Sequence, residues 1–188
     1  VSLNGTYVRV VNGQGPEGEA EIAEEDFTWT SDEGVSIAEL GSYVFLNQVR
    51  DWGLEFAPEV DFMHDKLRSY VNLDGTCNAY FDGNVNFYRK GDGCNNTARI
   101  ADVNYHEWGH GFHAYSLLTG DYDGSVSEGI GDTVAFLQTG DPTIAPYFGT
   151  NGWGIREVDS DRVYPDDWTN EVHTDGLIFA GAVWDLWG

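Results

Sequence analysis

Five consecutive residues in the middle of the chain have the types and the spacing of a catalytic zinc site. They are His106 to His110, HEWGH, within the stretch DVNYHEWGHGFHAY. On a helix, His106 and His110 lie one turn apart on the same face, so both imidazoles could reach one ion. Zinc bonds to imidazole nitrogen at about 2.0–2.1 Å and requires that convergence. Glu107 could take a proton from zinc-bound water and pass it to a leaving amine, which is the chemistry of peptide hydrolysis.

The alternative is an ordinary exposed helix face, because a five-residue pattern of this kind also arises by chance. A third ligand would decide between the two interpretations. The metzincin pattern, H-E-x-x-H-x-x-G-x-x-H, is excluded, since His113 stands at its glycine and Ser116 at its third histidine. We expect His113 to be a packing residue or to support a ligand.

A later acidic segment, GSVSEGIGDTVAF, offers a third ligand. Glu128 and Asp132 are one helical turn apart, so Glu128 could complete the zinc shell while Asp132 accepts the free ring N–H of a ligating histidine. Gly129 and Gly131 would permit close packing against a neighbouring helix. The alternative is that residues 125–128, SVSE, form a capping box, in which Glu128 serves only the start of the helix.

Hydrophobic periodicity predicts the elements that would position these residues. Short β-like runs, GTYVRVV and DFTWT, come first, and a helix with Ile37, Leu40, Val44 and Val49 as its apolar face runs from a capping box at Ser36 to Gly53. The segment LRSYVNL precedes a predicted hairpin, NAYF and NVNFYR joined at Asp82-Gly83. Further helices are predicted over 97–118, over 126–138 and from 171 onward. The first of these should end before Gly120, and Tyr115 should be among its buried residues.

Strands first and helices later indicate an α+β fold with a cleft where the two halves meet. We expect a β-containing N-terminal subdomain over 1–118, which ends in the helix that carries HEWGH, and a helical C-terminal subdomain over 119–188. The segment FAGAVWDLWG ends the chain while a helical pattern is still running. We therefore expect the sequence to be a piece of a longer protein.

The strongly acidic composition argues against nucleic acid and anionic membranes as binding partners. The formal net charge is −23, from 32 acidic and nine basic residues, which repels nucleic acid and anionic membrane surfaces. No apolar run is long enough to span a bilayer. The abundant carboxylates could provide oxygen ligands for calcium, or could simply be a solvated acidic surface.

Cys77 and Cys94 flank the predicted hairpin. A disulfide between them would close the base of the hairpin and contribute about 3 kcal/mol for a loop of that size. Such a bond favours an oxidising, extracellular compartment. The alternative is a pair of unlinked thiols.

Four blocks, in this order along the chain, resemble the thermolysin-like and fungalysin-like zinc peptidases, the gluzincins. They are NAYFDG at 78–83, HEWGH at 106–110, SEGIGD at 127–132 and NEVHTDG at 170–176. The resemblance covers roughly residues 75–188. It implies a thermolysin-like zincin catalytic core, with an N-terminal β-rich part and its hairpin edge strand, a central zinc-binding helix and a C-terminal helical part.

The resemblance also implies roles for residues outside the motif helix. Asn78 and the backbone of Ala79 would bind the main chain of the substrate as an added strand. His173 would donate to the oxyanion, and Arg156 would contact substrate carbonyls. The respective alternatives are a turn residue, a structural histidine and a surface ion pair. Asp102 stands where thermolysin-like enzymes place a calcium ligand, whereas Tyr122 does not align cleanly with their oxyanion-binding tyrosine.

We therefore expect a secreted zinc endopeptidase that acts on polypeptides. Zn²⁺ would be held by His106, His110 and Glu128, with Glu107 as general base, and Ca²⁺ is a further candidate ion. The G-x-M-E-N motif of gluzincin aminopeptidases is absent, which favours an endopeptidase. We expect a monomer unless the chain is part of a larger assembly. The rival hypothesis is a catalytically inert peptide-binding module with the same fold, or a fragment of a larger assembly.

Overall fold

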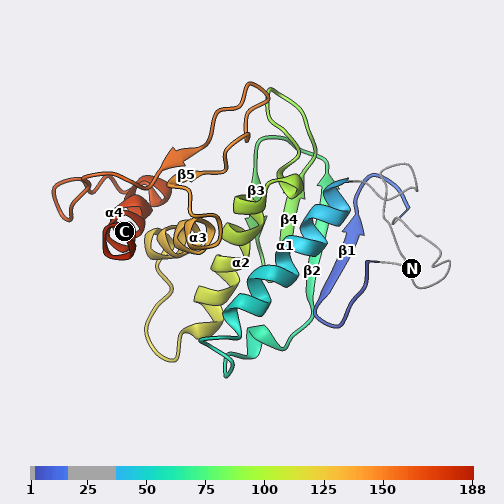
Figure 1. Ribbon diagram of the computed structural model, residues 1–188, viewed down its shortest axis with the longest axis horizontal. Helices are drawn as coiled ribbons and strands as arrows, with labels where there is room; N and C mark the ends of the chain where they lie inside the picture. The colour runs from blue at the N-terminus through green and yellow to red at the C-terminus, as the bar shows by residue number, and fades with distance from the viewer. Residues whose placement is uncertain (1–2, 17–36) are drawn as a thin grey trace.

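The computed structural model describes residues 3–16 and 37–188, and it has the expected α+β architecture. Figure 1 shows the elements in chain order. They are β1 (Val8–Asn12), α1 (Ile37–Gly53), η1 (Asp61–Met63), β2 (Leu67–Leu73), β3 (Ala79–Phe81), β4 (Val85–Tyr88), η2 (Thr97–Arg99), α2 (Ala101–Ser116), α3 (Gly124–Thr139), β5 (Thr143–Ile144), β6 (Arg156–Glu157) and α4 (Val172–Trp187). The predicted strand DFTWT and the capping residue Ser36 lie outside the described residues.

The main sheet has the strand order β1-β2-β4-β3, in which β1, β2 and β4 are parallel and β3 is antiparallel. The hairpin prediction is confirmed, since β3 and β4 pair through Ala79↔Phe87 and Phe81↔Val85. Its turn requires Gly83, which has a φ of +101°. The strand order places β3 at one edge of the sheet, as the resemblance implied.

Helix α1 lies across the sheet, and its buried face differs from the predicted one (Figure 1). Leu46 and Val49 are fully buried, but Ile37 is 50% and Val44 is 44% exposed. The buried face is partly polar instead, because Ser42 hydrogen-bonds Ser69 at 2.6 Å between the hydroxyl oxygens. An apolar pattern alone could not identify that face.

The motif helix begins four residues later than predicted. Asn96 accepts a hydrogen bond from the backbone N–H of Ala98 and caps the short turn η2, and Ile100 is then extended. Helix α2 therefore starts at Ala101 and ends at Ser116, before Gly120. Tyr115 is half exposed, so its predicted burial is wrong.

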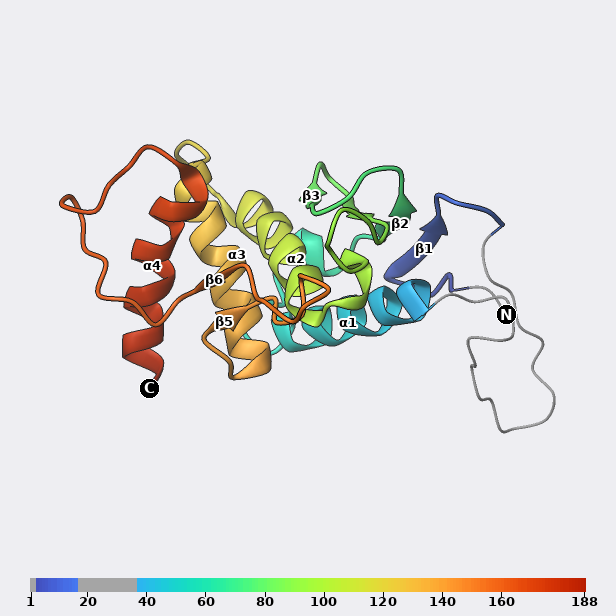
Figure 2. The same ribbon diagram turned by 90° about the horizontal axis from the view of Figure 1, so that it is seen from above.

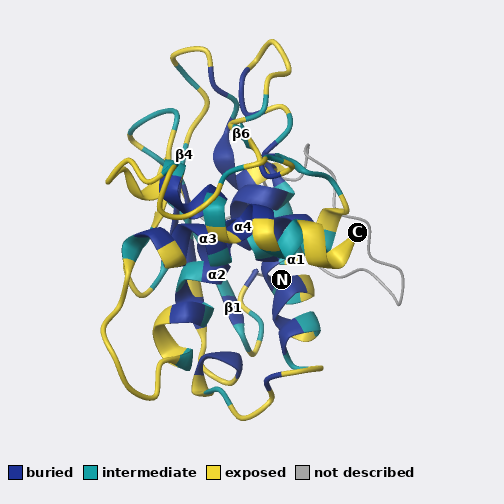
Figure 3. Ribbon diagram, turned by 90° about the vertical axis from the view of Figure 1, so that its left-hand side faces the viewer, coloured by how far each residue is buried: buried dark blue, intermediate teal, exposed yellow. Residues whose placement is uncertain are grey.

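Helices α2, α3 and α4 lie side by side, with the sheet at one end of the molecule and α4 at the other (Figure 2). A Cβ on Gly109 would lie 2.8 Å from the Cα of Gly131, and one on Gly129 would lie 2.7 Å from the carbonyl oxygen of Gly176. The glycines thus permit the close helix packing that was expected of this segment. Figure 3 shows buried residues concentrated on the helices and exposed ones on the surrounding loops.

A disulfide joins Cys77 and Cys94, with a Cα–Cα distance of 5.3 Å, as predicted. Cys94 also forms an isolated β-bridge with Gly149. The bond therefore connects the start of the hairpin to the loop between β5 and β6. The boundary at residue 118 falls between α2 and α3, and the division into two subdomains stays a prediction. In the part of the chain that the structure describes, no helix combines the length and apolarity needed to cross a bilayer.

Candidate metal centre and active site

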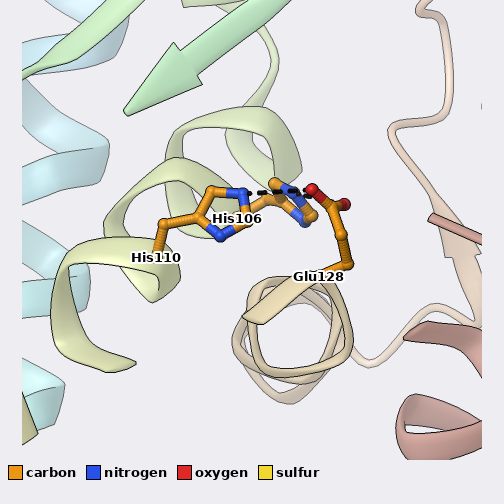
Figure 4. A group of neighbouring side chains, drawn as sticks. All are labelled: His106, His110 and Glu128. Atoms are coloured by element: carbon orange, nitrogen blue, oxygen red, sulfur yellow. Dashed lines mark ion pairs between the residues drawn. The ribbon is translucent and has the colours of Figure 1, made fainter. Parts of the chain in front are cut away.

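Two helices bring the three predicted ligands together. His106 and His110 come from α2 and Glu128 comes from α3, and Figure 4 shows both imidazoles and the carboxylate pointing toward one another. The Nε2 atoms of His106 and His110 lie 3.3 and 3.5 Å from the two carboxylate oxygens of Glu128. Ligand atoms at about 2.0–2.1 Å from a tetrahedral zinc ion would be about 3.3–3.4 Å apart. The donor atoms thus have the types that zinc requires, and one ligand atom from each of the three residues lies within 4.8 Å of the other two.

Asp132 lies on the far side of His106 from Glu128. Its Oδ1 is 2.9 Å from Nδ1 of His106. A hydrogen bond from Nδ1–H to this carboxylate would leave the lone pair of Nε2 directed at the metal position. Asp132 is fully buried and accepts two hydrogen bonds of 2.7 Å from Arg156. This is the geometry that the predicted role of Asp132 requires.

The capping-box alternative for Glu128 is wrong. Helix α3 begins at Gly124, and Asp123 caps it by accepting a hydrogen bond from the backbone N–H of Val126 at 2.9 Å. Ser125 is already inside the helix. Glu128 is therefore two residues too late for the acidic position of a capping box, and its carboxylate faces the two histidines instead.

The charges of the three ligands are strongly coupled. Burial lowers the pKa of His106, but its contacts with Asp132 and Glu128 outweigh this and raise the pKa to about 10. Burial and, next, the neighbouring His106 together lower the pKa of His110 to about 3. Although burial raises the pKa of Glu128, its contact with His106 brings that pKa down to about 2. The raised pKa of His106 favours a doubly protonated ring in the metal-free protein, and a metal ion would displace its Nε2 proton.

Glu107 lies on α2 between the two histidines and is 5% exposed. Its Oε2 is buried without a hydrogen-bond partner in the described part of the chain. Burial raises the pKa of Glu107 to about 7, although the nearby His106 opposes this shift. A buried oxygen without a partner is energetically costly, and the side chain of Glu107 also lines the adjoining cavity.

A cavity of about 420 Å³ opens beside the candidate metal centre. Its walls come from the hairpin, from α2, α3 and α4, and from the loop between β5 and β6. Its lining includes the eight residues predicted as metal ligands, catalytic groups or substrate contacts, and the rest of its wall is largely apolar. The predicted residues are Asn78, Ala79, His106, Glu107, His110, Glu128, Arg156 and His173, and the apolar ones are Val103, Ile144, Ala145, Phe148, Trp153, Ile155 and Leu177.

His173 lies in the first turn of α4 and faces the same carboxylate oxygen of Glu128 as His110 does. Its Nε2 is 3.5 Å from Oε1 of Glu128, and its Nδ1 is 2.7 Å from Oε1 of Glu171. Glu171 also caps α4, because it accepts hydrogen bonds from the backbone N–H groups of His173 and Thr174. Sequence reasoning missed Glu171, although an acidic residue two positions before His173 at a helix start was a usable signal.

Arg156 is not a surface ion-pair member. Its side chain is 13% exposed and contacts Asp132 and Glu128 at the rear of the cavity. Burial lowers the pKa of Arg156, but Asp132 outweighs this and raises it, so the guanidinium stays charged. Asn78 is exposed immediately before β3, and its backbone carbonyl accepts a hydrogen bond from the Thr97 hydroxyl. This contact fixes the backbone at the edge of the sheet.

The predicted calcium ligand Asp102 has a different contact. It is 3% exposed, and its Oδ2 accepts a hydrogen bond from the backbone N–H of Ala145 at 2.8 Å. Residues 3–16 and 37–188 contain no second group of histidine, cysteine and acidic side chains with the spacing of a metal site. A calcium site at Asp102 therefore stays a prediction.

Two further residues at the centre were missed as ligand supports. The Oγ of Ser127 lies 2.8 Å from Nδ1 of His110, and the hydroxyl of Tyr122 donates to the same Oγ at 2.6 Å. The position of Ser127 immediately before the predicted ligand Glu128 could have indicated this role. The role of Tyr122 depends on the path of the connection between α2 and α3, which the sequence does not specify.

Comparisons with known proteins support the fold. No protein-family model matches the sequence, and no curated protein matches it either. Among solved structures, the chain is similar to the precursor of protealysin, a metalloproteinase from Serratia proteamaculans, with a TM-score of 0.64 and 15% identity. The match covers 92% of this chain and 63% of that chain. The expected α+β fold is thus confirmed, and it is similar to the fold of that metalloproteinase precursor.

Proposed function

We propose that the chain is a secreted zinc-dependent endopeptidase of the gluzincin kind, which hydrolyses polypeptides. One observation carries the proposal. The candidate ligands His106, His110 and Glu128 lie in the same cavity as the carboxylate of Glu107, which has a buried oxygen without a hydrogen-bond partner. The zincin-like fold supports the same conclusion. The disulfide between Cys77 and Cys94 supports an oxidising, extracellular compartment.

Two imidazole nitrogens and a carboxylate form a ligand set that suits zinc and leaves one position open. When bound there, zinc would act as a Lewis acid that makes water more acidic and polarises the scissile carbonyl group. Other residues of the chain orient the two histidine ligands. Nδ1 of His106 is engaged by Asp132 and Nδ1 of His110 by Ser127, so that both Nε2 atoms face Glu128.

Glu107 acts as the general base and then as the general acid. Its carboxylate, which lines the cavity, accepts a proton from the attacking water. The carboxylic acid that results donates this proton to the departing amine nitrogen. The burial that raises its pKa to about 7 suits a group that must both take up and release a proton near neutral pH.

His173 stabilises the negative charge on the carbonyl oxygen of the substrate. Its Nε2 faces the metal centre, 3.5 Å from Glu128, while Glu171 holds its Nδ1. For Nε2 to donate while Nδ1–H is engaged, the ring must carry both protons. The N-terminal cap formed by Glu171 and the first turn of α4 then fix the direction of the donor.

The substrate binds as an extended strand beside β3. This strand is the edge of the sheet, and Asn78 and Ala79 line the cavity next to the metal centre. An edge strand offers backbone groups to an extended peptide, which gives recognition independent of side chains. Arg156 lines the same cavity and could donate a further N–H to a substrate carbonyl.

The test is hydrolysis of an unfolded protein substrate by the zinc-loaded chain, with Glu107→Gln as the matched control. We expect cleavage within the substrate chain, its loss on treatment with a chelator, and its return on addition of zinc. The Glu107→Gln variant should bind zinc as the wild type does and lose nearly all hydrolysis. Equal activity in this variant would refute the role of Glu107. Zinc and peptide binding without hydrolysis would favour the rival hypothesis of an inert binding module.

A further inference from the structure

The two histidine ligands are supported by different chemistry. His106 is held by the buried carboxylate of Asp132, whereas Nδ1 of His110 lies 2.8 Å from the hydroxyl oxygen of Ser127. Ser127 is fully buried and belongs to the same helix turn as Glu128. A serine hydroxyl is a weaker and more mobile partner than a carboxylate, because it can rotate about χ1. His110 therefore needs another group that holds the serine in place.

Tyr122 supplies that group. Its hydroxyl donates to Oγ of Ser127 at 2.6 Å. Without this contact, the serine hydroxyl on a helix could turn and bond the backbone carbonyl one turn earlier, which belongs to Asp123. With it, the oxygen stays directed at His110. Nε2 of His110 faces Glu128, so a metal-binding ring must carry its proton on Nδ1 and donate it to that oxygen.

His113 in turn holds Tyr122. The two rings stack with a centroid distance of 5.0 Å and an interplanar angle of 28°. His113 is 7% exposed and fixed on α2, whereas Tyr122 is half exposed in the connection between α2 and α3. The third histidine of the motif stretch thus packs against the tyrosine that reaches back to the second one.

We propose that Tyr122 is a positioning residue that acts through Ser127 to orient His110 for metal binding, with its ring braced by His113. The inference rests on the proposed metal site. Tyr122 touches neither the metal position nor the substrate in this role. Its effect should be transmitted by the single hydroxyl oxygen of Ser127, which receives both hydrogen bonds. Outer partners of this kind typically change metal affinity by about 10- to 100-fold.

The test is a double-mutant cycle with zinc affinity as the readout, measured by competition with a chelating dye. Ser127→Ala should weaken zinc binding about 10- to 100-fold, and Tyr122→Phe should weaken it by a smaller factor. In the Ser127→Ala background, Tyr122→Phe should have no further effect, because its path to His110 is already broken. Tyr115→Phe is the matched control, since Tyr115 is a similarly exposed tyrosine that stacks on Phe62.

Thermal unfolding of the metal-free variants separates positioning from general stability. A positioning role predicts that metal-free Tyr122→Phe unfolds at the wild-type temperature although its zinc affinity is lower. Wild-type zinc affinity in Tyr122→Phe, or equal losses from Tyr122→Phe in both backgrounds, would overturn the inference. If the wild type itself fails to bind zinc, the proposed function fails instead, so the two failures are distinguishable.

Discussion

His106 and Asp132 form a buried pair in which Nδ1 of the imidazole lies 2.9 Å from Oδ1 of the carboxylate. Arg156 holds both oxygens of Asp132 from the other side, at 2.7 Å each. The carboxylate is therefore fixed before any metal arrives. Because the pair comes from neighbouring helices, the orientation of a ligand on α2 depends on how α3 packs against it.

The first prediction concerns this pair. Asp132→Asn should lower zinc affinity about 10- to 100-fold, because a neutral amide is a weaker acceptor for Nδ1–H and can donate to Nδ1 instead. Competition with a chelating dye measures the affinity. Glu128→Ala is the reference, since it removes a ligand and should cause a larger loss. Undiminished zinc affinity in Asp132→Asn would mean that Asp132 serves only Arg156.

The second prediction concerns His173. His173→Ala should lower kcat/KM about 10²- to 10³-fold, the usual effect of removing one oxyanion donor, while zinc affinity changes little. Steady-state hydrolysis of a peptide and a zinc titration of the same samples provide the two readouts. Glu171→Gln is the matched variant. It keeps an acceptor for the helix cap but removes the charge at Nδ1 of His173, 2.7 Å away, and should give a smaller loss.

Loss of zinc in His173→Ala would contradict this assignment and make His173 a ligand. The double variant gives a further check. If Glu171 acts only by holding the ring, then Glu171→Gln should have no additional effect on kcat/KM once His173 is absent.

The third prediction concerns the disulfide. Cys77 precedes the edge strand β3, while Cys94 bridges to Gly149 in the loop that contributes Phe148 to the cavity wall. The double substitution of both cysteines by serine should lower the free energy of unfolding by about 2–4 kcal/mol. Since two walls of the cavity lose a shared anchor, KM should rise more than kcat falls. Chemical denaturation and peptide kinetics measure both effects, and an unchanged KM would limit the disulfide to a stabilising role.

The hairpin and the motif helix could be predicted from the sequence because each depends on local pattern, and Glu128 remains the predicted third ligand. A turn glycine between two apolar strands and a histidine pair one helical turn apart need no knowledge of distant residues. The face of α1 could not be predicted in this way. Arg50 is buried because its Nε donates to the carbonyl of Met63 and its guanidinium lies over the ring of Tyr7. Such tertiary partners place polar residues where periodicity expects apolar ones.

Most of the residues that support the candidate ligands could not be predicted from the sequence, because their contacts also depend on tertiary structure. Asp132 could be predicted because it lies one helical turn from a ligand. Ser127 and Tyr122 became visible only through the contact of α3 with α2 and the path of the connection between them. For Glu171, likewise, the sequence indicates a helix cap, but its contact with the His173 ring depends on the direction of both side chains.

The last prediction concerns Asp102, whose carboxylate holds the backbone of Ala145 at the cavity wall. Burial raises the pKa of Asp102 from 3.8 to about 6. The folded state therefore binds this proton more tightly than the unfolded state does. This difference adds about 3 kcal/mol to the free energy of unfolding below pH 4, and the contribution is lost as the pH rises through 6.

Asp102→Asn should remove this loss, because an amide oxygen can still accept from the N–H of Ala145 without carrying charge. The variant should match the wild type below pH 4 and exceed its free energy of unfolding above pH 6 by up to about 3 kcal/mol. Denaturation of metal-free protein across this range measures the difference, and Asp161→Asn, an exposed carboxylate, is the control. Repeating the series with calcium tests the predicted ligand. Calcium that stabilises only the wild type would show that Asp102 binds the ion and would reverse the expected order above pH 6.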